Sequence, residues 1–161
     1  MVNKYGWVDM GSSFLPSEFN AAYLWAQLEQ LDDIQGKRKE IWHRYYEGLN
    51  GKIGNDVKLP FIPEYATNNA HMFYLLCPSL AYRSAWMKFL KENDVMTTFH
   101  YLPLHSSKYY VDKHDGRVLP NCDRYADTLL RLPLFYELSE WEIDKIIKLI
   151  IEFCNTKSYG L

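Results

Sequence analysis

Apolar residues recur at intervals of three or four through the first third of the chain, a spacing that places them on one face of a helix. The repeating positions are Leu24, Leu28, Leu31, Ile34, Ile41, Tyr45 and Leu49. No proline occurs between Glu18 and Leu49, and the preceding Ser17 is a typical N-cap because its hydroxyl can accept a hydrogen bond from the first turn. The pattern predicts one helix of about 30 residues, with Gly36 as the place for a bend. A helix of about 45 Å is too long for one small core to cover, so its first half is expected to connect to something else.

Short apolar runs alternate with helical patterns in the rest of the chain. Strands are predicted at residues 57–62, 70–77, 95–102 and 130–134, and helices at residues 79–93, 122–130 and 139–155. The last helix has the clearest start, because Ser139 and Glu142 match a capping box. This order of elements predicts an α+β fold, with a long N-terminal helix and a three- to four-stranded sheet with helices packed on one face.

Composition is that of an ordinary globular domain. Of the 161 residues, 48% are hydrophobic and 24% are charged, so one domain with a buried core is expected. The net charge of −2 argues against a nucleic-acid partner, and the apolar runs are too short to cross a membrane. The three cysteines are far apart and form no CxxC pair, so a cytoplasmic protein with reduced thiols is the simplest interpretation.

The stretch FHYLPLHSSKYY, residues 99–110, gathers many of the polar groups that chemistry could use. His100 and His105 are five residues apart, but no further ligand stands close by in sequence to complete a metal site. A histidine that bonds to backbone at a strand end is the simpler interpretation. Lys108 follows two serines in a polar loop, where a solvated lysine is far more common than a nucleophile.

A second polar cluster, formed by Asn68, Asn69 and His71, precedes a predicted strand and could face a cleft or simply finish a loop. The chain contains no GxSxG, P-loop, GxGxxG or HExxH motif. The residues alone therefore leave open whether FHYLPLHSSKYY belongs to an active site, a metal site or an ordinary strand end.

Four segments, in order along the chain, resemble blocks of the C-terminal domain in the DegT/DnrJ/EryC1/StrS family. They are VDMGSSFLPSEFNAAYLWAQLEQLDDI at 8–34, NAHMFYLL at 69–76, FLKENDVMTTFHYLPLH at 89–105 and LLRLPLFYELSEWEIDKII at 129–147. Members of this family are pyridoxal-phosphate-dependent sugar aminotransferases of fold type I. The segment GSSFLPSEFNAAYLWAQLE is most similar to the branch that makes dTDP-4-amino-4,6-dideoxygalactose for surface polysaccharides.

The first segment resembles the family pattern GYNxR. Gly11 matches the glycine, Ser13 stands at the asparagine and Leu15 stands at the arginine. In the family, that asparagine reaches the cofactor phosphate of the opposite subunit, and a serine hydroxyl can also donate a hydrogen bond to phosphate. The resemblance therefore implies a cofactor contact by Ser13.

FHYLPLH resembles the family block HYPxPLH, which lies at the end of a strand and faces the cleft. The resemblance implies that His100, Tyr101 and His105 contact the substrate. Lys108 has no such counterpart, because the Schiff-base lysine of the family belongs to a different motif that no lysine of this chain matches. No catalytic residue is therefore assigned.

The resemblance implies the C-terminal part of an aminotransferase that transfers an amino group from glutamate to a nucleotide-linked 4-keto-6-deoxy sugar, in lipopolysaccharide or deoxysugar biosynthesis. Residues 1–16 would be an irregular lead-in from a missing N-terminal cofactor domain, residues 17–155 the aminotransferase C-terminal domain, and residues 156–161 a tail. The whole enzyme would bind pyridoxal 5'-phosphate, whereas this chain alone is expected to be inactive and not to hold the cofactor. Its apolar helix predicts a homodimer or another form of self-association.

A free-standing, non-catalytic binding or regulatory module with the same fold is the second hypothesis, because a fold does not fix a function. The third is an isolated zinc protein based on His100 and His105.

Overall fold

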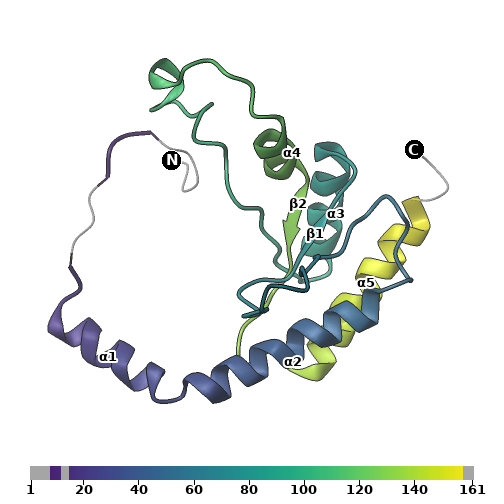
Figure 1. Ribbon diagram of the computed structural model, residues 1–161. Coiled ribbons are helices and arrows are strands. Elements are labelled where there is room, and N and C mark those ends of the chain that lie inside the picture. Colours follow the sequence, from purple (N-terminus) through teal and green to yellow (C-terminus); the bar gives the residue numbers. More distant parts are fainter. Residues whose placement is uncertain (1–7, 12–14, 158–161) are drawn as a thin grey trace.

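The computed structural model describes residues 8–11 and 15–157, and its elements are shown in Figure 1. In chain order they are α1 (Glu18–Leu28), α2 (Leu31–Leu49), β1 (Tyr74–Leu76), α3 (Leu80–Glu92), the 3-10 helix η1 (Val111–Lys113), α4 (Pro120–Thr128), β2 (Leu129–Arg131) and α5 (Glu140–Lys157). The α+β class is confirmed.

The predicted long helix is interrupted, and the prediction of a single helix with a bend at Gly36 was wrong. The break falls at Glu29 and Gln30, where the backbone N–H of Gln30 bonds to the carbonyl of Gln27 at 3.1 Å and tightens the last turn. The Glu29 carboxylate accepts a hydrogen bond from the Trp25 indole at 3.2 Å. A new helix then begins, with Gly36 inside it.

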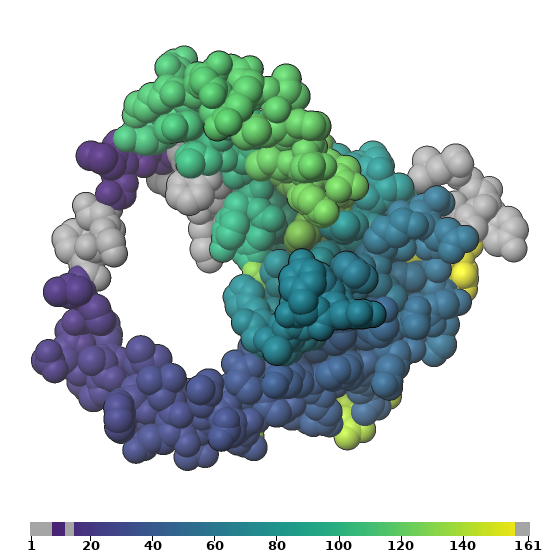
Figure 2. All heavy atoms as spheres, in the orientation of Figure 1, coloured from purple at the N-terminus to yellow at the C-terminus, as the bar shows by residue number. Residues whose placement is uncertain are grey.

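The two helices differ in what they bury. Helix α2 buries four apolar or aromatic side chains, Ile41, Trp42, Tyr45 and Leu49, and it packs against α5. Helix α1 has no buried residue, and Phe19 and Trp25 remain 84% and 67% exposed. Figures 1 and 2 show α1 extending away from the body of the domain. No helix in the described part of the chain combines the length and apolar character needed to cross a membrane.

The sheet is smaller than the sequence predicts. Strands β1 and β2 are antiparallel, with Leu75 opposite Leu130. The other two predicted strands each contribute one isolated bridge, Lys58 to Leu76 on one side and Thr98 to Arg131 on the other. All four segments therefore lie side by side. Pro60 removes a ladder donor from the first segment, and Pro63 and Pro103 directly follow the ends of the two outer segments.

An aromatic core holds the helices against this short sheet. The rings of Trp86 and Phe153 stack with centroids 5.3 Å apart, and Tyr45 lies against Phe73 at 5.2 Å. The buried Tyr45 hydroxyl donates to the carbonyl of Pro133 at 3.0 Å, and burial raises the pKa of this phenol. Helix α2 is thereby fixed to the segment that follows β2.

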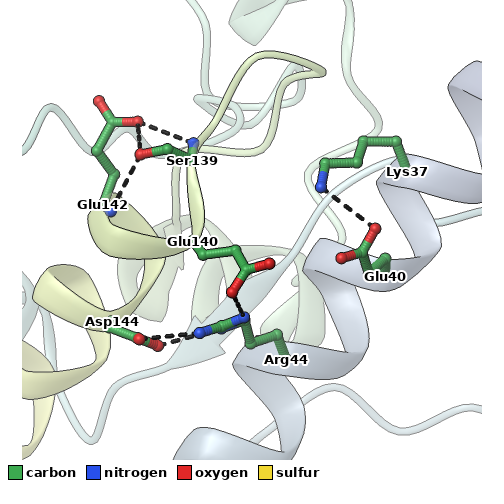
Figure 3. Close-up of polar contacts among 7 residues, drawn as sticks. All are labelled: Lys37, Glu40, Arg44, Ser139, Glu140, Glu142 and Asp144. Carbon is green, nitrogen blue, oxygen red and sulfur yellow. Dashed lines mark hydrogen bonds and ion pairs between the residues drawn. The ribbon is translucent and has the colours of Figure 1, made fainter.

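Ion pairs at the surface fix the position of α2 relative to α5 (Figure 3). Arg44 donates through Nη1 to Glu140 at 2.7 Å and through Nη2 to Asp144 at 2.9 Å. Its hydrogen bond lowers the pKa of Asp144. Exposed pairs contribute little energy, but a guanidinium that bridges two carboxylates fixes the relative position of the helices. Figure 3 also shows the predicted capping box, in which the Ser139 N–H donates to Glu142 at 2.9 Å.

Two glycines of α2 provide a matched test of the α2–α5 contact. A Cβ at Gly48 would lie 2.5 Å from Cδ1 of Ile147 in α5, whereas a Cβ at Gly36 would meet no atom within 4 Å. Gly36→Ala is expected to raise the free energy of unfolding by about 1 kcal/mol through helix propensity. Gly48→Ala has the same gain in helix propensity, but overpacking against Ile147 costs about 1–3 kcal/mol, so the free energy of unfolding is expected to fall by up to about 2 kcal/mol. Urea denaturation measures both, and equal effects would contradict the close approach of the two helices.

Candidate functional site

The stretch FHYLPLH leaves the sheet beside β2. The backbone N–H of Arg131 donates to the carbonyl of Thr98 at 2.7 Å, which fixes the start of the stretch. Beyond this bridge the chain has no regular structure until η1, and Tyr101 is 55% exposed. The stretch is therefore joined to the sheet at its start and presents its side chains from a loop.

His100 lies against Arg131. The guanidinium Nη1 contacts Nδ1 of the imidazole and lies 3.1 Å from Nε2. Burial lowers the pKa of His100, and the charges of Arg131 and His71 lower it further. Because a neutral imidazole keeps one nitrogen as an acceptor, the neutral form suits a guanidinium partner. The Tyr101 ring packs on the same imidazole, with the centroids 4.1 Å apart.

His105 has different partners. Its Nε2 lies 3.0 Å from the Asp123 carboxylate of α4, and its ring lies 5.4 Å from that of His114. His100 contacts β2 through Arg131, and His105 contacts α4. Within residues 8–11 and 15–157, no three His, Cys, Asp or Glu side chains are grouped so that they could hold a metal ion. The structure therefore brings His100 and Tyr101 together and assigns His105 to a second cluster.

A polar hollow of about 500 Å³ lies beside His100 and shares Arg131 with it. It is lined by residues of α2, of the segment before β1, and of β2 and its continuation: Ile34, Gln35, Arg38, Asn69, His71, Arg131 and Leu134. The polar cluster around Asn69 and His71 thus faces a cavity, which is one of the two outcomes the sequence left open. The two arginines were not singled out by sequence reasoning. An arginine inside the apolar run LLRLPL was the available signal for one of them.

Side-chain hydrogen bonds shape the entrance to β1 at this hollow. The side-chain oxygens of Asn68 and Asn69 accept from the backbone N–H groups of Ala70 and His71, at 2.8 Å and 3.0 Å. Ala70 has a positive φ of 50°, which the Asn68 bond helps to hold. This turn directs the carbonyl of Ala70 at Arg38, whose Nη2 donates to it at 3.0 Å.

Comparison with known proteins identifies the family. The family model of DegT/DnrJ/EryC1/StrS aminotransferases matches residues 2–151, which is nearly the whole chain. The chain belongs to this family. The resemblance of its four segments to the family is thereby confirmed, whereas the assignment to the dTDP-4-amino-4,6-dideoxygalactose branch stays a prediction.

Solved structures of the family share the fold. The chain is 27% identical to the aminotransferase TlmJ from Streptoalloteichus hindustanus, over 82% of this chain and 35% of that one, with a TM-score of 0.72. A DegT DnrJ EryC1 StrS aminotransferase from Brucella abortus is 28% identical, over 83% of this chain and 35% of that one, with a TM-score of 0.69. DesV of S. venezuelae was solved in complex with a ketimine intermediate. It is 25% identical, over 94% of this chain and 40% of that one, with a TM-score of 0.79. The chain thus spans 35–40% of the length of these three enzymes.

Ser13, the predicted cofactor contact, lies outside the residues that the structure describes. Its role stays a prediction, as do the substrate contacts predicted for His100, Tyr101 and His105.

The pKa of His100 tests the geometry around Arg131. Arg131→Met removes a positive charge and leaves the imidazole surrounded by protein, so the pKa of His100 is expected to rise toward the usual value of about 6.5. An NMR pH titration of the imidazole measures the change, with Arg117→Met, in an exposed ion pair, as the control. Because the pKa of His100 is lowered in the folded protein, the free energy of unfolding should decrease as the pH falls below about 6.5 and through the folded pKa. The decrease should be smaller in Arg131→Met. An unchanged titration in Arg131→Met would contradict the contact.

Proposed function

We propose that this chain is the C-terminal part of a pyridoxal-phosphate-dependent aminotransferase that acts on a nucleotide-linked 4-keto-6-deoxy sugar, with glutamate as the amino donor. The observation that carries the proposal is the family match over residues 2–151, supported by the fold shared with DesV. The process would be the synthesis of a surface polysaccharide such as lipopolysaccharide or of another deoxysugar product, in the cytoplasm. The branch that makes dTDP-4-amino-4,6-dideoxygalactose is the specific case we favour.

The residues around the hollow beside His100 do not supply all that the cofactor needs. Pyridoxal phosphate supplies the electron sink for transamination, and the protein must supply a lysine and a phosphate-binding site. The residues that line the hollow include no lysine, and Lys108 is an exposed loop residue. We therefore propose that a separate cofactor domain supplies the lysine, consistent with the greater length of the relatives, and that this chain alone is inactive. Ser13 would add a phosphate contact in the opposite subunit.

His100 and Tyr101 would form the sugar side of the cleft. The Tyr101 ring is more than half exposed, and its contact with His100 holds one of its faces. The exposed part of the ring can pack on the apolar face of a sugar or base, since an aromatic ring adds contact area at little conformational cost. His105 would border the cleft from its own position beside Asp123.

The apolar side of α1 would be covered by the cofactor domain or by a second subunit of a homodimer. Leu24, Trp25 and Leu28 are all at least half exposed on an 11-residue helix with no buried residue. A soluble domain rarely leaves such a patch uncovered.

The inactivity of the chain alone can be tested directly. The purified 161-residue chain, given pyridoxal phosphate, glutamate and a nucleotide-linked 4-keto-6-deoxyhexose, is expected to form no amino sugar by mass spectrometry. It is also expected to leave the visible absorbance of the cofactor unchanged. Adding the polypeptide encoded immediately upstream should restore activity if that polypeptide is the cofactor domain. Transamination by the chain alone would refute this part of the proposal, and an unrelated upstream protein would favour a binding module.

The substrate contact of Tyr101 is tested in the active assembly. Tyr101→Ala is expected to raise KM for the sugar nucleotide by up to about tenfold, the range of one lost aromatic contact, and to leave KM for glutamate unchanged. Steady-state kinetics measure both constants. The matched control is Tyr65→Ala, since Tyr65 is 92% exposed and is not among the residues that line the hollow beside His100. An equal effect on both substrates, or none on either, would contradict the assignment.

A further inference from the structure

The hollow beside His100 has an unbalanced charge. Two guanidinium groups, those of Arg38 and Arg131, line it together with His71, and no aspartate or glutamate is among its lining residues. Elsewhere in the fold the arginines Arg44 and Arg117 pair with carboxylates. Within the described part of the chain, neither Arg38 nor Arg131 forms an ion pair with a carboxylate.

Two residues that line this hollow also have a buried polar atom without a partner among the described residues. Nε of Arg131 and Oε1 of Gln35 are buried and have no hydrogen-bond partner among the described residues. The Nη1 atom of Arg131 contacts His100, and Nη2 of Arg38 donates to the carbonyls of Ala70 and His71. Buried donors are nearly always satisfied in folded proteins, so an unpaired guanidinium N–H beside a hollow indicates a partner outside the described residues, such as a bound ligand.

A carboxylate in the first turn of α2 already has a hydrogen-bond partner. Asp33, one residue before a lining residue, accepts a hydrogen bond from the Tyr136 hydroxyl at 2.6 Å. This bond raises the pKa of Tyr136. Asp33 is therefore hydrogen-bonded to Tyr136, and it forms no ion pair with Arg38 or Arg131 in the described part of the chain.

We propose that this hollow binds an anionic oxygen group, a carboxylate or a phosphate, of a substrate of the enzyme. Guanidinium groups bind both chemistries through paired N–H donors. The volume, about 500 Å³, falls in the range of small-molecule sites. The assignment to a substrate rests on the proposed function, in which two sources are available: a carboxylate of the amino donor and the diphosphate of the sugar nucleotide.

Binding at this place also has a consequence for His100. The charge of Arg131 is one of the causes that lower the pKa of His100, after burial. An anion bound at Arg131 offsets that charge and should raise the pKa again. The imidazole therefore reports on the occupancy of the hollow without any substitution.

The test is a titration of the 161-residue chain, followed by NMR at constant ionic strength, with pyrophosphate in one arm and glutarate in the other. Saturable shifts are expected at the amides of Arg38, Asn69, His71 and Arg131, with a rise in the His100 pKa. The neutral diamide of glutarate is the matched ligand control and should produce neither effect. Tighter binding of pyrophosphate identifies the diphosphate as the source, and tighter binding of glutarate identifies the carboxylate.

Substitutions then locate the site. Arg131→Met is expected to weaken binding of the preferred anion at least tenfold, whereas Arg117→Met should leave it unchanged. If Arg131→Met fails to fold, the rise of the His100 pKa in the unmodified chain still decides the matter. Absence of saturable binding by both anions would overturn the proposal. So would binding that Arg131→Met leaves intact, or binding that leaves the His100 titration unchanged.

This experiment is independent of transamination. Anion binding is measured on the chain without cofactor, so its failure leaves the aminotransferase assignment standing. If the chain showed no transamination even together with a cofactor domain, a positive binding result would still stand. It would then describe an anion site in a protein with another function.

Discussion

The short strand β2 is the constraint on which both the fold and the site depend. It pairs with β1 on one side and forms the Thr98 bridge on the other, so it lies between the two segments that carry the candidate residues. Its last residue, Arg131, has its backbone in both pairings while its side chain contacts His100 and lines the hollow. A shift of one residue in this strand would turn Arg131 to the opposite face and separate these features. The apolar neighbours Leu130 and Leu132, both buried, oppose such a shift.

Local signals in the sequence predicted much of the fold. Ser17 and Ser139 cap α1 and α5 as expected, because side-chain capping depends only on neighbouring residues. The break at Glu29 and Gln30 was not predictable from spacing, since the apolar period continues across it. The number of strands depends on long-range pairing, and there the prolines of the outer segments limited two predicted strands to single bridges.

The candidate site was less accessible from sequence than the fold. His100 and Tyr101 were found through one contiguous motif, but the same motif included His105, which the structure places beside Asp123 instead. Neighbours in a loop need not face the same cavity. The hollow could not be predicted from the sequence, because its lining residues come from α2 and from β2, about a hundred positions apart. No spacing rule connects residues so far apart. Only the position of an arginine between leucines, in the run LLRLPL, pointed to it.

The uncovered helix α1 has a consequence for how the molecule reaches its final form. It is 11 residues long, less than an isolated helix needs to persist in water, and none of its side chains is buried by the rest of the domain. Its stability must therefore come from whatever surface closes over Phe19 and Trp25. The connecting segment would acquire its lasting helical order as the larger protein assembles, so that the joining of the parts is itself the last step of folding.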